Sequence, residues 1–181
     1  MIKLKNILLE GKSPSIFIPR RMEDRVERMV ATYIRNGSKG YLNLRQMNLN
    51  KLPDILKNVN VGGSFNCSVN NLTSLENAPK SVDGDFYSSG NELTSLVGAP
   101  KTVGEDFYCS YNLLTSLEGA PETVGGDFYC GYNKLTSLVG APKYVGGIFV
   151  CNDNPGNFTE AQVRAVCDVK GEVVALPRKI S

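Results

Sequence analysis

Tyrosine and aspartate side chains recur through the middle of the chain at a step of 21 residues, and they are residue types suited to binding a protein. One row holds Tyr87, Tyr108 and Tyr129, a second holds Tyr111 and Tyr132, and a third holds Asp85, Asp106 and Asp127. Tyrosine offers a partner a large, rigid contact area and a hydroxyl group. A row of carboxylates favours a basic partner. These eight residues are therefore the predicted partner-binding residues.

The same rows have a structural interpretation, which the sequence leaves open. Aligned tyrosines can stack across neighbouring strands, and Asp after Gly-Gly is typical of turns. A repeated unit repeats its side chains whether or not anything binds them, so departures from the repeat are more informative. Tyr111 and Tyr132 fill two of the five places in their row, and Val69, Gly90 and Asp153 fill the others. The two tyrosines are therefore the preferred contact residues.

No arrangement of residues in the sequence points to catalysis, a cofactor or a metal ion. The chain has no His, which removes the usual base of hydrolytic triads and the commonest metal ligand. Carboxylates held in a rigid row repel one another, which disfavours a metal on the Asp row. The cysteines follow the 21-residue step rather than a zinc spacing, with Ser88 interrupting the row. We expect a non-enzymatic protein in a reduced compartment, with a narrow interior filled by Cys67, Cys109, Cys130 and Cys151.

The net charge of +2 hides an uneven distribution. Residues 1–60 hold 12 basic and 5 acidic side chains, residues 61–160 hold 4 and 11, and residues 161–181 hold 4 and 2. The middle of the chain, at −7, does not suit duplex DNA, which requires a basic surface. Nucleic-acid binding by the basic N-terminal region is a minor alternative, through Arg20, Arg21, Arg25 and Arg28. No apolar run is long enough to span a membrane.

The 21-residue step is a property of the whole middle segment, which predicts stacked repeats. Phenylalanine, asparagine, leucine, proline and valine each form a row, and the rows begin at Phe65, Asn70, Leu72, Pro79 and Val82. A degenerate copy precedes them at a step of 23, in which Leu42 aligns with Phe65. Asn is expected at a strand-to-loop corner, where its amide can bond the backbone of neighbouring coils. Ala-Pro prevents a helix, so the far side of each coil is expected to be extended.

The unit V-x-G-D-F-Y-C-S-Y-N-x-L-T-S-L-x-G-A-P resembles the leucine-rich repeat, with Phe and Cys at the two L-x-L strand positions and Asn at its usual place. The short period and the T-S-L-x-G-A-P tail resemble the repeats of secreted enterobacterial effectors. The resemblance covers residues 41–157. It implies an α/β solenoid, a leucine-rich-repeat stack of short parallel strands with an extended convex side. It also implies that the Tyr and Asp rows line the concave face, the usual recognition surface of such solenoids.

A solenoid needs caps over its terminal coils, and both flanking segments have suitable patterns. Residues 20–40 predict an N-terminal cap helix with an apolar face that includes Val26 and Val30, followed by Gly37 as a stop signal. Residues 158–181 predict a C-terminal cap, in which Thr159 and Gln162 form a capping box before a short helix. Residues 169–176 then form a strand or extended tail.

Residues 1–19 are an apolar-basic leader or extended segment. Within it, Leu8-Leu9-Glu10-Gly11 resembles the processing site in internal head proteins of T-even-type phages. That resemblance implies cleavage between Glu10 and Gly11 and a place inside the virion. The G-D-F-Y-C repeats are also similar to repeats in proteins of large tailed phages. We therefore expect a phage-encoded, monomeric module in the host cytoplasm that binds a host or phage protein and inhibits host defence, with a virion internal protein as the alternative.

Overall fold

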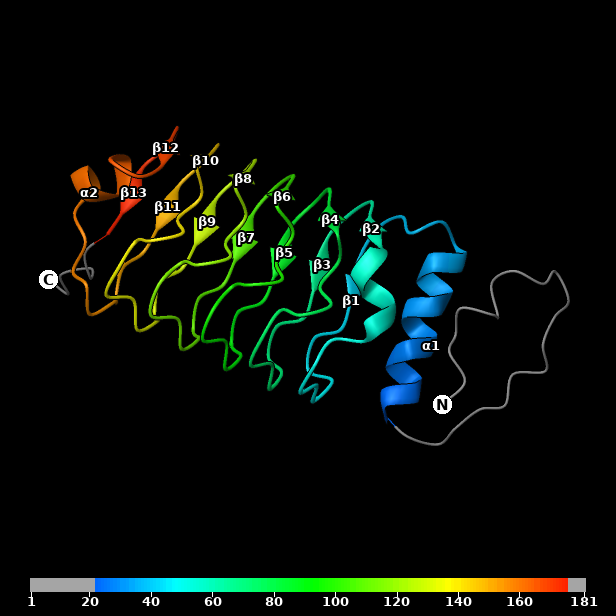
Figure 1. Cartoon of the computed structure of the whole chain (residues 1–181). Coiled ribbons are helices and arrows are strands. Elements are labelled where there is room, and N and C mark those ends of the chain that lie inside the picture. Colours follow the sequence, from blue (N-terminus) through cyan, green and yellow to red (C-terminus); the bar gives the residue numbers. More distant parts are fainter. Residues whose placement is uncertain (1–21, 176–181) are drawn as a thin grey trace, which may run out of the picture.

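The computed structural model describes residues 22–175, which form a parallel-strand β-solenoid. Successive coils lie side by side in a row, and each interior coil contributes one strand to each of two ladders (Figure 1). A unit of about 21 residues is too short to bury its own apolar side chains, so neighbouring coils bury them together. Among the described residues, no helix is long and apolar enough to cross a membrane.

The larger ladder, which we call the Phe sheet, has seven parallel strands of two residues. Its strands in spatial order are β1 (Leu42–Asn43), β3 (Phe65–Asn66), β5 (Phe86–Tyr87), β7 (Phe107–Tyr108), β9 (Phe128–Tyr129), β11 (Phe149–Val150) and β13 (Val173–Val174). Phe65 pairs with Phe86, and Leu42 pairs with Phe65. The steps of 21 and 23 residues in the sequence are therefore confirmed as strand register.

The second ladder, the Val sheet, has six parallel strands, and three residues separate each of them from the following strand of the Phe sheet. These are β2 (Asn60–Val61), β4 (Ser81–Val82), β6 (Thr102–Val103), β8 (Thr123–Val124), β10 (Tyr144–Val145) and β12 (Asp168–Val169). The row of buried valines that begins at Val82 points into the core from this sheet. The sequence predicted extended backbone near these residues, but it did not reveal that the segments pair as a second sheet.

Helices lie only near the two ends of the described chain. They are α1 (Met22–Arg35), the 3-10 helix η2 (Asp54–Asn58) and α2 (Glu160–Arg164). Val26 and Val30 of α1 are fully buried, and Gly37, with a φ of 84°, ends the helix through its N–H bond to the Ile34 carbonyl. From residue 61 to residue 157 the coils contain strands, turns and irregular backbone and no helix, as expected from the buried proline row.

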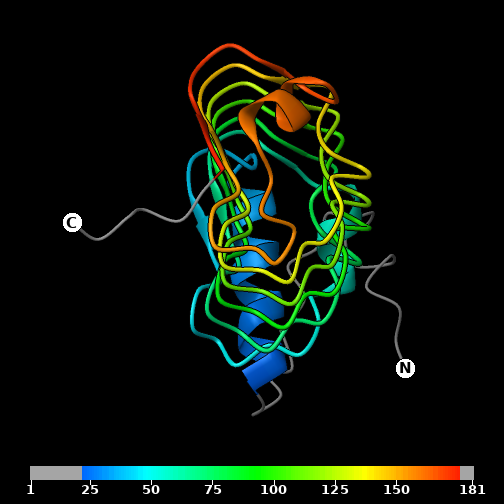
Figure 2. The same cartoon turned by 90° about the vertical axis from the view of Figure 1, so that its left-hand side faces the viewer.

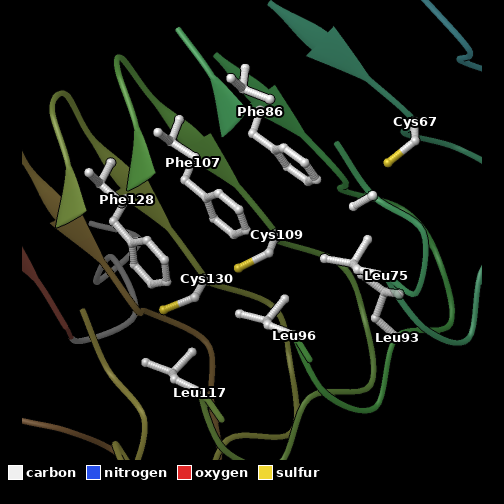
Figure 3. Packing of buried hydrophobic residues seen from close by; sticks show 14 of the residues in the cluster. Cys67, Leu75, Phe86, Leu93, Leu96, Phe107, Cys109, Leu117, Phe128 and Cys130 are labelled. Carbon is white, nitrogen blue, oxygen red and sulfur yellow. The ribbon is translucent and has the colours of Figure 1, made fainter. Parts of the chain in front are cut away.

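The core is built from rows of identical side chains (Figure 3). Phe86, Phe107 and Phe128 are fully buried and stack with ring-centroid distances of 5.1 and 5.5 Å. In Figure 3 their rings lie in the same interior as the thiols of Cys109 and Cys130. Rings of neighbouring coils contact one another, so each coil depends on the next to bury its side chains.

Asparagines at the end of each Phe-sheet strand join neighbouring coils, as predicted. The Asn112 oxygen accepts the Leu93 N–H at 3.1 Å, and its amide nitrogen donates to the carbonyls of Ser88 and Cys109, both at 3.1 Å. The same pattern recurs at Asn91, Asn133 and Asn154. Among the described residues, every buried side-chain nitrogen or oxygen has a hydrogen-bond partner.

The described C-terminal segment lies at the end of the stack (Figure 1). Figure 2 shows the coils nearly superposed along the stack, with α2 at the near end. The capping box predicted at Thr159 and Gln162 is present, and both of its hydrogen bonds form. Arg164 donates to the carbonyls of Val169 and Gly171, which fixes α2 against the following segment. That segment continues both ladders as β12 and β13.

Candidate protein-binding surface

The outward side of the Phe sheet carries all five tyrosines predicted to bind a partner, and we call this surface the Tyr face: Tyr87, Tyr108, Tyr129, Tyr111 and Tyr132. Tyr87, Tyr108 and Tyr129 stack at centroid distances of 4.7 and 4.6 Å, nearly parallel and half-buried. Their alignment follows from the register, because paired residues of a parallel sheet lie one strand spacing apart. The stacking predicted as the structural interpretation of this row is therefore present.

The Asp row supports these tyrosines. The Tyr108 hydroxyl donates to Asp106 Oδ2 at 2.8 Å, and Tyr87 and Tyr129 make the same bond to Asp85 and Asp127. The other oxygen of Asp106 accepts the backbone N–H of Asp127 at 2.7 Å. Each carboxylate therefore already accepts hydrogen bonds from its own coil and from the next coil. This is a structural role for the row that first suggested a basic partner.

The environment of the stacked tyrosines changes their acidity. Desolvation by burial, followed by the hydrogen bond to Asp85 and the charge of that carboxylate, raises the pKa of Tyr87 to about 12. The same causes raise the pKa of Tyr129 to about 12, and they raise the pKa of Tyr108 further. These phenols are therefore fixed hydrogen-bond donors to carboxylates rather than acids or bases.

Tyr111 and Tyr132 differ from the other three tyrosines in exposure and backbone. Their side chains are 60% and 47% exposed, and their rings stack at 4.5 Å with an angle of 4° between the planes. Their φ angles are 56° and 54°, in the left-handed region that residues other than Gly, Asn and Asp rarely adopt. Val69, Gly90 and Asp153 in the same row also have positive φ. The fold imposes this conformation on the row, and two of its places present large aromatic rings to solvent.

The places between the two tyrosine rows hold small residues: Ser68, Ser89, Ser110 and Gly131. A depression of about 360 Å³ lies at the N-terminal end of this row. Tyr87, Gly90 and Tyr111 line it, and Arg45 contributes the positive charge. The sequence placed these residues in rows, but it did not reveal the depression between them.

The described residues contain no group of three or more acidic, Cys or His side chains placed to hold a metal ion. All five cysteines are free thiols, and all are buried. Burial raises the pKa of the Cys67, Cys109 and Cys130 thiols well above the ordinary range. Ser88 replaces a cysteine in this row, and its hydroxyl donates to the Tyr108 carbonyl at 2.9 Å, much as the Cys109 thiol donates to the Tyr129 carbonyl at 3.3 Å.

The remaining predicted residues lie at the N-terminal end of the chain. Arg25 and Arg28 are exposed on α1. Arg20, Arg21 and the predicted processing site at Glu10 and Gly11 lie outside the described residues. The structure therefore places the tyrosine and aspartate rows on one surface, with the two basic residues of α1 on the helix beside the first coil.

The order of residues along each coil is similar to the leucine-rich-repeat pattern. Phe and Tyr form the two-residue strand, the buried Cys follows it directly, and Asn bonds the backbone at the corner. No protein-family model matches the chain. No curated protein matches it either. Among solved structures, the chain is similar to the leucine-rich-repeat domain of a Shigella effector, with a TM-score of 0.49 and 21% identity over 88% of this chain and 80% of that one.

Proposed function

We propose that this protein is a non-enzymatic binding module that engages a partner protein through the Tyr face. The observation that carries the proposal is the exposed Tyr111–Tyr132 pair, held in left-handed backbone conformation. A residue with a Cβ in that conformation loses about 1–2 kcal/mol. Such strain concentrates at functional sites, because elsewhere a less strained residue is available.

The neighbouring places in the same row support a role in binding over a role in folding. Gly90 and Asp153 occupy equivalent positions in adjacent coils, so the coil does not require a tyrosine there. Tyr87, Tyr108 and Tyr129, by contrast, are half-buried, and each donates a hydrogen bond to a carboxylate of its own coil. Tyr132 also hydrogen-bonds a carboxylate, that of Asp153, but it is 47% exposed. Exposed, rigid aromatic rings beside a row of small residues are typical of interaction hot spots.

Affinity capture from bacterial lysate with quantitative mass spectrometry tests the proposal. The Tyr111→Ala, Tyr132→Ala double variant should lower recovery of a captured partner at least about tenfold, the loss expected from removing a hot spot. Val97→Ala and Val139→Ala are matched controls, because these side chains are 56% and 69% exposed but lie outside the Tyr face. Unchanged recovery with the double variant would remove the Tyr face as the binding surface.

We extend the proposal to a phage-encoded protein that acts in the host cytoplasm and inhibits a host defence protein. The support is the likeness of the G-D-F-Y-C repeats to phage proteins and the Leu8–Gly11 sequence. Mass spectrometry of infected cells and of purified particles tests this location. Recovery from particles of a chain that begins at Gly11 would contradict it and would support an internal virion protein.

We also infer that the two end segments cap the solenoid. The fully buried Val26 and Val30 of α1 support this role at one end, and the Arg164 bonds to Val169 and Gly171 support it at the other. Val26→Ser together with Val30→Ser should lower the melting temperature and promote oligomers, because the first coil would lose its apolar cover. A monomer of unchanged melting temperature would argue against capping by α1.

A further inference from the structure

The row that holds Tyr132 and Tyr111 has a vacant place at Gly90. Tyr132 covers one face of the Tyr111 ring at 4.5 Å, and the two planes are nearly parallel. The opposite face of Tyr111 is therefore turned toward Gly90, the next place in the row. Both residues line the same depression, and Val69 bounds it one coil further on. Two strand spacings of about 4.8 Å each separate the Val69 and Tyr111 places, which leaves room for one planar group.

The charge at this place differs from the charge of the middle segment as a whole. The residues that line the depression are Arg45, Asn66, Ser68, Val69, Tyr87, Ser89, Gly90 and Tyr111. Arg45 is the one charged residue among them, and no hydrogen bond or ion pair of its guanidinium is found within residues 22–175. Asp85 lies outside the lining and already accepts the Tyr87 hydroxyl and the Asp106 N–H. A ligand in the depression therefore meets one cation, Arg45, and one exposed aromatic face, that of Tyr111.

We propose that the depression binds an aromatic side chain of a partner polypeptide, stacked on Tyr111 above Gly90, with a neighbouring carboxylate of the same polypeptide on Arg45. This inference rests on the proposed function and names the partner chemistry of that surface. The ligand ring completes the Tyr132–Tyr111 stack, which gives offset stacking of the kind that aromatic pairs favour. The carboxylate accepts hydrogen bonds from the guanidinium of Arg45, whose planar fork can donate two of them in bidentate geometry.

A polypeptide fits this site better than a nucleic acid. A nucleotide also offers an aromatic ring and an anion, but binding along a phosphate backbone draws on several cations at once. The depression provides Arg45 alone, and residues 61–160 carry a net charge of −7. A single carboxylate beside an aromatic residue requires only the one cation that is present.

The chain has no Trp, so a Trp-containing peptide is a selective fluorescent probe of the full-length protein. We expect the anisotropy of acetyl-Glu-Gly-Trp-Gly-Glu-amide to rise on binding, with a dissociation constant below about 1 mM. Peptides with Leu in place of Trp, or with Lys in place of both Glu residues, should compete at least about tenfold more weakly. No binding at about 1 mM, or equal competition by the Leu or Lys peptide, overturns the proposal.

Two substitutions at Gly90 distinguish a loss of binding caused by filling the vacant place from a loss caused by disturbing the surface. A Cβ built on Gly90 meets Val69 Cγ2 at 3.6 Å, an ordinary contact, and Tyr111 and Tyr132 show that the row accepts tyrosine at positive φ. Gly90→Tyr should therefore fold, place a third ring in the stack and weaken the peptide at least about tenfold. Gly90→Ala adds only the Cβ, and we expect binding within about twofold of the native protein. Native affinity in Gly90→Tyr overturns the proposal.

Charge reversal tests the second contact. Arg45→Glu should weaken the Glu peptide and strengthen the Lys peptide, because the sign of the one charge in the depression changes. An unchanged order of the two peptides removes Arg45 from the site and overturns the proposal. Tighter binding of a short single-stranded oligonucleotide than of the Glu peptide, lost in Gly90→Tyr, would overturn the polypeptide as ligand.

The same variants distinguish this inference from the proposed function in affinity capture. If Tyr111→Ala with Tyr132→Ala removes the partner while Gly90→Tyr leaves its recovery unchanged, the inference fails and the Tyr face remains the binding surface. If both variants leave recovery unchanged, both proposals fail. Loss of the partner in both variants, together with peptide binding by the native protein, supports an aromatic side chain of the partner in the vacant place at Gly90.

Discussion

The hydroxyl group of Tyr108 donates a 2.8 Å hydrogen bond to the carboxylate of Asp106, two residues earlier in the same coil. The second oxygen of Asp106 accepts the N–H of Asp127 in the next coil. A side chain that is acidic and half-exposed therefore connects a surface tyrosine to the backbone ladder. The Asp row contributes to folding whether or not a partner meets it.

Asp106→Ala should lower the free energy of unfolding by about 1–3 kcal/mol, because it leaves the Asp127 N–H and the Tyr108 hydroxyl without their acceptor. Urea unfolding followed by circular dichroism measures the change. Glu105→Ala is the matched control, since this neighbour is exposed, and we expect a change within about 0.5 kcal/mol. Equal losses in the two variants would show that the carboxylate bonds do not matter for stability.

Alkaline pH should weaken the fold through the stacked tyrosines. The pKa of Tyr87 is raised from an ordinary 10.0 to about 12, so the folded state favours the protonated phenol more than the unfolded state does. The stabilisation is complete below pH 10 and disappears as the pH rises through about 12.

A spectrophotometric phenolate titration tests this expectation. Tyr129→Phe should remove one of the late-titrating groups, because the pKa of Tyr129 is also raised to about 12. Ionisation of all the tyrosines near pH 10 in the folded protein would contradict the Tyr–Asp bonds.

Gly125→Ala should destabilise the solenoid by about 1–3 kcal/mol, the usual effect of overpacking. A Cβ at Gly125 would lie 1.9 Å from the Gly104 carbonyl oxygen of the preceding coil, so the two coils must move apart. Differential scanning calorimetry of this variant and of Glu105→Ala, a substitution at an exposed residue, gives the comparison. An equal or larger fall in melting temperature for Glu105→Ala would refute the close approach of the coils at Gly125.

Asn112→Ala should lower the free energy of unfolding by about 2–4 kcal/mol, because buried backbone groups in two coils would lose their partners. Asn112→Asp should recover only part of the loss, since its carboxylate can accept the Leu93 N–H but cannot donate to carbonyl oxygens. Chemical denaturation measures both variants beside Asn50→Ala, an exposed asparagine of the first coil. Neutral behaviour of Asn112→Ala would contradict the inter-coil role of the row.

Tyr111→Gly should change stability by less than about 1 kcal/mol while abolishing partner binding. Glycine relieves the left-handed backbone by about 1–2 kcal/mol, and loss of the stack with Tyr132 removes about 0.5–1.5 kcal/mol. Thermal unfolding and affinity capture of one preparation report the two effects separately. A strongly destabilised variant would make the tyrosine pair a folding element.

Rows of identical residues carry most of the information that the sequence holds about this fold. Phe65 and Asn70 repeat at a constant step, so strand register and the inter-coil asparagines follow from the sequence alone. The Val sheet could not be predicted from the sequence, because a two-residue extended segment after Ala-Pro can equally well be unpaired backbone. Tyr111 was a preferred contact residue because it departs from its row. The sequence did not predict its positive φ, since tyrosine rarely adopts that conformation. The depression at Gly90 required the arrangement of three coils in space.

Side-chain hydrogen bonds between coils span 19 to 26 residues, which is one step of the stack. Asn112 reaches the preceding coil and Asp106 reaches the following one, so each interior coil meets the same donors and acceptors on both sides. Duplication or loss of a whole 21-residue unit would consequently preserve every type of junction. The gene can therefore lengthen or shorten this recognition surface in whole units, and the number and spacing of exposed rings can change in evolution without a new fold.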